Sequence, residues 1–130
     1  MNISNYLGMP YDIHNESGVN CWTLYKLIKK QEQGINVVLF KAPSANVKKI
    51  NDVFSSALSD GCHGHFRVDK PEDFDLVLMT KETKRQKIYH CGIWYNGMVM
   101  HARGSGQNGQ VWYQESSELS EYSLEFWRNE

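Results

Sequence analysis

The sequence predicts an α+β fold in which N-terminal helices pack on one face of an antiparallel β-sheet. Helical periodicity of apolar residues is confined to the first half of the chain, and strand-like segments follow one another in the second half. Consecutive strands joined by short connections form antiparallel sheets, and helices commonly cover one face of such a sheet. Because 130 residues are enough to bury one core, we expect a single domain over residues 1–130.

The first predicted helix covers residues 21–33 and begins at a cysteine. The i, i+3, i+4, i+7 spacing of one apolar helical face is met by Cys21, Leu24, Tyr25 and Ile28. Asn20 precedes the helix as a favourable N-cap, and Gly34 follows it as a residue that commonly ends helices. A second apolar stripe predicts a helix over residues 45–59, whereas residues 1–19 are expected to be irregular.

Strands are predicted in the second half of the chain. Apolar, β-branched and aromatic residues are concentrated at residues 75–79, 110–114 and 122–128. A hairpin lies between the first two of these segments, because Asn96-Gly97 is a frequent two-residue turn and is flanked by apolar and aromatic residues. The basic stretch at residues 81–87 is expected to be a solvated loop between strands.

The hairpin would place two histidines on one face of the sheet. Pairing at the turn brings Gly92 opposite His101, which leaves an open notch beside the ring, and it pairs His90 with Arg103. The two histidines become diagonal neighbours, with Cβ atoms about 6–8 Å apart. We expect the first helix to lie across this histidine face. The other face would join the core and carries Cys91, Ile93, Tyr95, Met98, Met100 and Ala102.

Cys21 falls in the first turn of its predicted helix. There the free backbone N–H groups and the positive end of the helix dipole favour a thiolate. A cysteine placed in this way, in a chain with histidines elsewhere, is a candidate nucleophile if the fold brings the groups together. The alternative is a free cysteine that is simply buried in the core.

The composition argues against several classes of function. The net charge is −1, so we expect neither a nucleic acid nor an anionic membrane as a partner. No apolar run approaches membrane-spanning length, and the N-terminus lacks the basic and apolar regions of a signal peptide. The 3 cysteines are odd in number and widely spaced, which argues against a disulfide framework and favours a reducing compartment.

Several short motifs occur in an order that is typical of one family. They are Leu7-Gly8-Met9-Pro10-Tyr11, Asn20-Cys21-Trp22-Thr23-Leu24, Phe74-Asp75-Leu76-Val77-Leu78, His90-Cys91-Gly92-Ile93-Trp94 and Met98-Val99-Met100-His101-Ala102. With these motifs and the ending Leu124-Glu125-Phe126-Trp127-Arg128, the chain resembles the NlpC/P60 superfamily of papain-like cysteine peptidases. It is most similar to the branch found in bacteriophage tail proteins. The resemblance extends over nearly the whole chain and implies a papain-like fold.

The resemblance also implies roles for individual residues. Cys21 would be the nucleophile, His90 the general base and later the acid, and His101 the residue that orients His90. Tyr11 matches a family position that contacts substrate. Backbone N–H groups at the helix start, including that of Cys21, would stabilise the oxyanion, an effect of about 3–4 kcal/mol per donor. Such covalent acyl transfer needs neither a metal nor an organic cofactor.

Four positions depart from the pattern of the family. Asn20 replaces a common Asp, and Thr23 stands where Gly or Ser is usual, so that its bulk would crowd the helix against the sheet. Phe74 replaces a common Gly. Cys91 replaces an apolar residue and is interpreted as a small core hydrophobe. These changes leave the predicted triad intact and bear on substrate preference.

Three further features have two interpretations each. Trp94 shares the histidine face and is either a packing residue or part of the substrate groove. Arg103 either binds a carboxylate of the substrate or simply ends its strand. Cys62-His63-Gly64-His65 contains the residue types of a metal site, but no second ligand pair has zinc-like spacing, so it is interpreted as a loop.

The predicted function is that of a cysteine endopeptidase acting on peptidoglycan stem peptides, at the D-Glu–diamino acid type of bond that the resemblance implies. The expected partners are this substrate and phage tail-tip proteins. The expected location is the virion tail, after synthesis in the bacterial cytoplasm. Two alternatives remain open. One is a structural or tail-assembly subunit whose peptidase site is idle or trims a protein partner, and the other is a delivered antibacterial amidase of the same fold.

Overall fold

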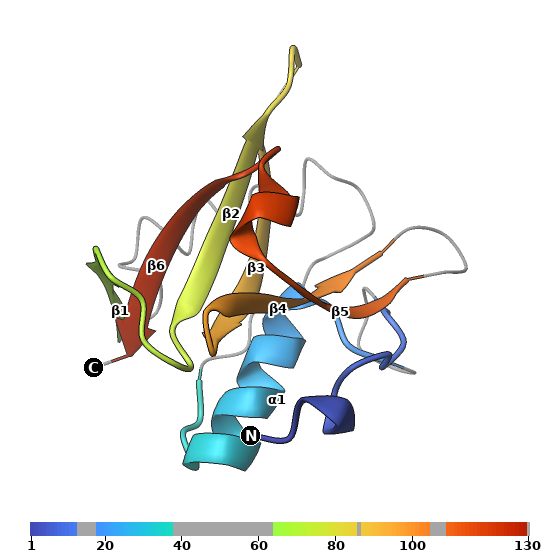
Figure 1. The fold of residues 1–130 in the computed structure, drawn as a ribbon, viewed down its shortest axis with the longest axis vertical. Coiled ribbons are helices and arrows are strands. Elements are labelled where there is room, and N and C mark those ends of the chain that lie inside the picture. Colours follow the sequence, from blue (N-terminus) through green and yellow to red (C-terminus); the bar gives the residue numbers. More distant parts are fainter. Residues whose placement is uncertain (13–17, 38–63, 86, 105–108, 130) are drawn as a thin grey trace.

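The computed structural model describes residues 1–12, 18–37, 64–85, 87–104 and 109–129, in which one α-helix accompanies a six-stranded antiparallel sheet (Figure 1). The α+β class is thereby confirmed for these residues, while the papain-like fold stays a prediction. The strands follow the order β1-β6-β2-β3-β4-β5 across the sheet. The elements are η1 (Ile3–Asn5), α1 (Cys21–Gln33), β1 (His65–Val68), β2 (Leu76–Glu82), β3 (Lys87–Tyr95), β4 (Met98–Arg103), β5 (Gln110–Gln114), η3 (Ser116–Leu119) and β6 (Ser123–Asn129).

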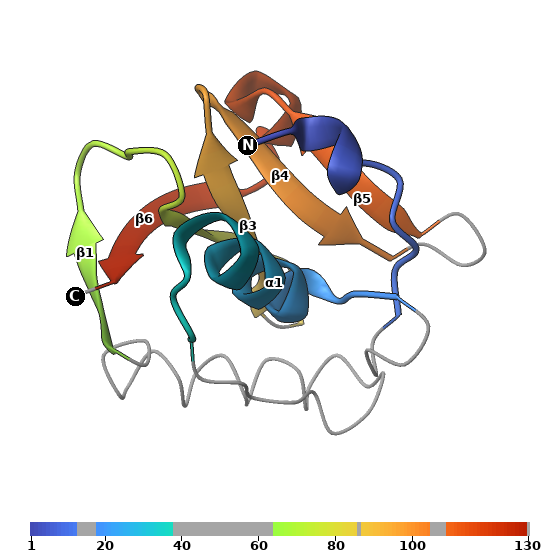
Figure 2. The same ribbon diagram turned by 90° about the horizontal axis from the view of Figure 1, so that it is seen from below.

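The helix α1 has the boundaries that the sequence predicts. Asn20 caps its first turn, and Gly34 ends it in the left-handed conformation with φ of 68°. Its apolar face is buried against β3 and β4, and Figure 2 shows it lying across the sheet at β3. Within the described ranges, no helix is long and apolar enough to cross a lipid bilayer. The helix predicted over residues 45–59 lies outside the described residues.

Apolar clusters cover both faces of the sheet. The face against α1 carries the main core, which includes Leu76, Leu78, Cys91, Ile93, Met100, Ala102 and Val111. The opposite face carries a smaller cluster of Val77, Met79, Val99 and Leu119, the last contributed by η3. Since the side chains of β2 alternate between these two clusters, residues 76–80 are all buried. β2 is therefore covered on both faces between its neighbours β3 and β6.

The body of α1 does not lie across the histidine face as predicted, although Cys21 in its first turn contacts His90. The helix packs on the face of Cys91 and Met100, whereas His90 and His101 alternate with these residues and belong to the opposite face. The larger of the two apolar clusters lies on the first of these faces, and an amphipathic helix buries its apolar side against such a surface. Tyr95 and Met98, which were also expected in the core, are partly exposed.

The strands β3 and β4 separate a short distance from their turn. The predicted pairing at the turn is confirmed, but the expected pair of His90 with Arg103 is absent from the β3–β4 ladder. Gly92 nevertheless lies beside His101, because a Cβ placed on Gly92 would be 3.0 Å from His101 Cβ. The open notch expected there is wrong, since the same Cβ would lie 2.8 Å from the carbonyl oxygen of Met100. The paired residues are Tyr95–Met98, Trp94–Val99 and Ile93–Met100.

The C-terminal strand lies inside the sheet. The prediction placed residues 122–128 as a strand that closes the sheet, but β6 pairs with both β2 and β1, so that β1 forms the edge. His65 was interpreted as part of a loop, yet it begins β1. Its Nε2 atom lies 2.6 Å from the hydroxyl of Tyr25, which ties this edge strand to α1. Cys62 and His63 lie outside the described residues.

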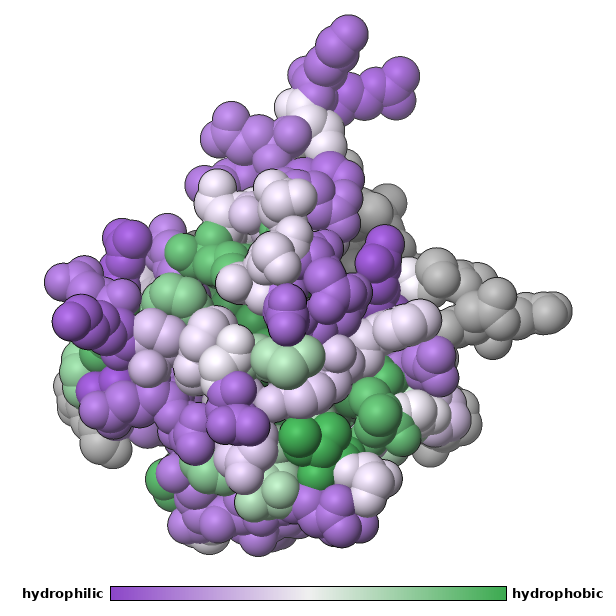
Figure 3. All heavy atoms as spheres, viewed as in Figure 1, coloured by the Kyte–Doolittle hydropathy of each residue, from purple (hydrophilic) through white to green (hydrophobic). Residues whose placement is uncertain are grey.

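The connection between β2 and β3 protrudes from the sheet. Figure 3 shows hydrophilic side chains over this tip, and residues 82–85 are exposed. The loop expected over residues 81–87 is shorter than predicted, because Lys81 and Glu82 belong to β2 and Lys87 begins β3, while residues 83–85 form an exposed connection.

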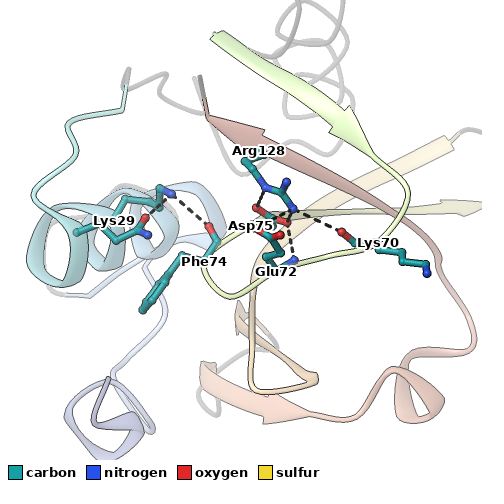
Figure 4. A network of polar contacts seen from close by, with 7 residues as sticks. Lys29, Lys70, Glu72, Phe74, Asp75 and Arg128 are labelled. Atoms are coloured by element: carbon teal, nitrogen blue, oxygen red, sulfur yellow. Dashed lines mark hydrogen bonds and ion pairs between the residues drawn. The ribbon is translucent and has the colours of Figure 1, made fainter.

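A buried carboxylate fixes the start of β2. The guanidinium of Arg128 on β6 donates hydrogen bonds to both oxygens of Asp75, at 2.9 and 2.8 Å (Figure 4). Close by, Lys29 of α1 donates a hydrogen bond to the carbonyl of Phe74 at 3.3 Å. Burial lowers the pKa of Lys29. These contacts join α1, β2 and β6 at one point.

Phe74, at this point, adopts a left-handed backbone conformation with φ of 74°. Such a conformation costs a non-glycine residue about 1–2 kcal/mol, which gives a reason for the Gly that the resembled family commonly has here. We expect Phe74→Gly to be more stable than Phe74→Ala by about 1 kcal/mol, although alanine is normally the more stabilising of the two. Urea denaturation of both variants measures the difference, and a more stable alanine variant would contradict it.

Candidate active site

The first turn of α1 positions Cys21. Asn20 Oδ1 accepts a hydrogen bond from the backbone N–H of Thr23 at 2.9 Å, and Thr23 Oγ1 accepts one from the backbone N–H of Asn20 at 2.8 Å. This reciprocal cap fixes the helix start. Thr23 was expected to crowd the helix, but its hydroxyl completes the cap instead.

The thiol of Cys21 lies among groups that stabilise its anion. A hydrogen bond with the side chain of Cys91 is the largest cause that lowers the pKa of Cys21 well below its usual range. Burial opposes this effect, while a hydrogen bond with His90, the positive charge of His90 and the backbone of Cys91 add to it. Cys21 remains partly exposed, whereas Cys91 is buried. The site therefore combines a thiolate with access from solvent, which is the environment of a reactive cysteine.

Two histidines and a glutamine form a chain of short hydrogen bonds across three strands. His90 Nε2 on β3 lies 2.9 Å from His101 Nδ1 on β4. His101 Nε2 in turn lies 2.7 Å from Gln114 Oε1 on β5. The two imidazole rings meet edge to face, with centroids 5.1 Å apart. The structure thus brings the three predicted catalytic side chains, Cys21, His90 and His101, into one connected site.

His101 is a neutral ring at physiological pH. Its side chain is 1% exposed. Burial lowers the pKa of His101 to about 4, and the positive charges of His90 and Arg103 act in the same direction. The hydrogen bond with Gln114 opposes these effects without overcoming them. A neutral imidazole has one N–H donor and one bare nitrogen, so His101 can accept a hydrogen bond at one end while it donates at the other.

The N-terminal segment holds Tyr11 close enough to Cys21 for the charge of the thiol to affect its hydroxyl. The backbone N–H of Tyr11 donates to the carbonyl of Gly109 at 3.0 Å, and its ring packs so closely on Gly104 that a Cβ there would overlap it. Burial, followed by the charges of Cys21 and Asp12, raises the pKa of Tyr11 to about 12. The phenol therefore keeps its proton beside Cys21 and is available as a hydrogen-bond donor.

Trp94 and Arg103, the other residues predicted to bind substrate, lie in different surroundings. Trp94 packs edge to face on Phe126, with ring centroids 5.3 Å apart, in the cluster on the face opposite α1. Arg103 is exposed at the end of β4, close enough for its charge to affect His101. The contacts of Trp94 are those of a packing residue, and its role toward substrate stays a prediction, as does that of Arg103.

Three residues of the site were missed by the sequence interpretation. Gln114 could have been found, because a residue two positions beyond the cross-strand partner of His101 shares its face. Cys91 was assigned to the core, and its contact with Cys21 depends on how α1 is placed. Tyr122 follows η3, and its ring lies 6.3 Å from that of His90, which no local pattern indicates.

Comparisons with protein families, with curated proteins and with solved structures found no match to this chain. Its function must therefore be inferred from the site itself and from the sequence motifs.

Proposed function

We propose that this protein is a cysteine endopeptidase that hydrolyses peptidoglycan stem peptides at a D-Glu–diamino acid type of bond, as part of a phage tail tip. One observation carries the chemistry: a thiol with a lowered pKa contacts His90, which His101 holds through a bond of 2.9 Å. A nucleophile, a base and a group that orients the base are the parts needed for covalent acyl transfer. The location is proposed on the resemblance, and the substrate on the resemblance together with Arg103.

The reaction begins with attack of the Cys21 thiolate on the carbonyl carbon of the scissile peptide bond. The tetrahedral oxyanion that forms is stabilised by the backbone N–H of Cys21 at the start of α1, with the Tyr11 hydroxyl as a further donor nearby. His90 then gives a proton to the leaving amine as the carbon–nitrogen bond breaks, which leaves a thioester on Cys21. Water, deprotonated by His90, attacks the thioester and releases the acid and the free thiolate.

The charges around the site fit an anionic peptide. Stem peptides carry free carboxylates, and Arg103 offers an exposed guanidinium at the end of β4. An arginine can bind a carboxylate through two parallel hydrogen bonds. Arg103 therefore supports the proposed substrate class in preference to a basic peptide.

Digestion of purified cell walls tests the proposal. The wild-type protein is expected to release fragments whose masses show a new amino terminus at a diamino acid, and Cys21→Ala is expected to release none. Thermal unfolding of both proteins controls for loss of the fold, because a partly exposed side chain can be shortened at little cost. If the wild-type protein leaves every wall peptide intact, a structural tail subunit becomes the better assignment. Cleavage by the alanine variant at the wild-type rate would remove Cys21 from the mechanism.

A further inference from the structure

Gln114 is the last member of the hydrogen-bond chain and lies farthest from the thiol. It ends β5, and its Oε1 atom is 2.7 Å from His101 Nε2. The other nitrogen of His101, Nδ1, is 2.9 Å from His90 Nε2. His90 therefore has only its own Nδ1 left for the contact with Cys21. In this hydrogen-bond chain each histidine therefore uses one ring nitrogen for each of its two neighbours.

The positions of the hydrogen atoms follow from this arrangement. An amide oxygen can only accept, so His101 must carry its proton on Nε2 to bond Gln114. Since His101 is neutral, its Nδ1 is then bare and accepts a hydrogen bond from His90 Nε2. With its Nε2 protonated, a neutral His90 presents a bare Nδ1 toward the thiol. That is the form that can take the proton of Cys21.

We infer that Gln114 is a positioning residue that selects the tautomer of His101 and thereby makes His90 a base toward Cys21. This inference rests on the proposed peptidase function. When His90 accepts the thiol proton it carries N–H groups on both nitrogens, and the bare Nδ1 of His101 receives one of them. If His101 instead carried its proton on Nδ1, this N–H would face the N–H on Nε2 of protonated His90 across 2.9 Å. The two donors would have no acceptor between them, and protonation of His90 would be opposed.

Removal of the amide oxygen of Gln114 should reverse the tautomer preference of His101. A buried N–H without an acceptor costs more than a buried bare nitrogen, so His101 would move its proton to Nδ1 and donate it to His90. We expect Gln114→Met, which keeps the length of the side chain, to reduce kcat about ten- to hundredfold with little change in KM. The matched control is Gln110→Met, the same substitution on the same strand, and it is expected to keep wild-type kcat.

Gln114→Glu separates the proposed role from simple packing. A carboxylate also accepts the Nε2 proton, so this variant should keep the tautomer and most of the activity above neutral pH. Its negative charge raises the pKa of His101. His101 then gains a second proton at a higher pH than in the wild type, and the acid limb of the kcat profile should move upward. If Gln114 only filled space, the methionine variant, which has the same length, would keep the activity as well.

Nitrogen NMR of the imidazoles tests the inference independently of cleavage. In the wild type His101 should be protonated at Nε2, and in Gln114→Met at Nδ1. Protonation at Nδ1 in the wild type would overturn the inference, and so would wild-type kcat in Gln114→Met or equal losses in the methionine and glutamate variants. If the wild type cleaves no peptide, the proposed function fails, while the NMR spectra still decide the tautomer.

Discussion

Replacing His90 with alanine is expected to lower peptide cleavage by about 10⁴-fold or more, since base and leaving-group acid are lost together. The same change should slow alkylation of Cys21 at acidic pH. The hydrogen bond and positive charge of His90 both lower the pKa of Cys21, so their removal raises this pKa and reduces the thiolate fraction. Iodoacetamide labelling followed by mass spectrometry at about pH 6, well below the ordinary thiol pKa of about 8.5, measures the effect.

Cys91→Ala is the informative comparison for His90→Ala. It removes the largest cause that lowers the pKa of Cys21 but leaves His90 in place. Alkylation at about pH 6 should therefore slow in both variants, while cleavage at higher pH should be retained only in Cys91→Ala. Alkylation of the His90 variant with the wild-type pH profile would show that the thiol and the imidazole do not interact.

Gly92→Ala is expected to destabilise the fold by about 1–3 kcal/mol and to impair the site at the same time. A Cβ at this position would lie 2.8 Å from the carbonyl oxygen of Met100 and 3.0 Å from His101 Cβ. The first of these atoms belongs to the backbone of β4 and cannot rotate away. The strand would have to shift, and His101 would shift with it. Urea denaturation and wall digestion measure the two effects.

Gly34→Ala provides the control that separates the two effects. A Cβ on Gly34 meets nothing within 4 Å, but its φ of 68° is left-handed, so the variant should lose about 1 kcal/mol of stability through backbone strain alone. The residue ends α1 at the end opposite Cys21, and cleavage should be unchanged. A Gly92 variant that loses stability but keeps full activity would show that β4 can shift without moving His101.

Local signals in the sequence were enough to predict α1 and the β3–β4 hairpin, which carry the catalytic side chains. The cap at Asn20 and the stop at Gly34 fixed the ends of α1, and the Asn96-Gly97 turn fixed the register of the β3–β4 hairpin. That register alone predicts that the two histidines lie on one face of the sheet. Their hydrogen bond follows the predicted diagonal.

The errors concern how elements pack, which short-range patterns do not encode. Each face of the hairpin was a possible partner for α1, and the choice depends on apolar surface contributed by β2 and β5 as well. The insertion of β6 between β1 and β2 joins segments about half the chain apart. Gln114 was overlooked for a related reason, because its role depends on the pairing of β4 with β5.

The N-terminal segment that holds Tyr11 also shields the outer edge of the sheet. Gly8 donates a backbone hydrogen bond to Val111 at 3.1 Å, and Val111 donates one to Met9 at 2.9 Å, so the backbone groups of Val111 on the outer side of β5 are already paired. Unprotected edge strands invite aggregation through pairing between molecules. A change that detached this segment from β5 would therefore expose backbone groups of an edge strand and at the same time move the Tyr11 phenol away from Cys21.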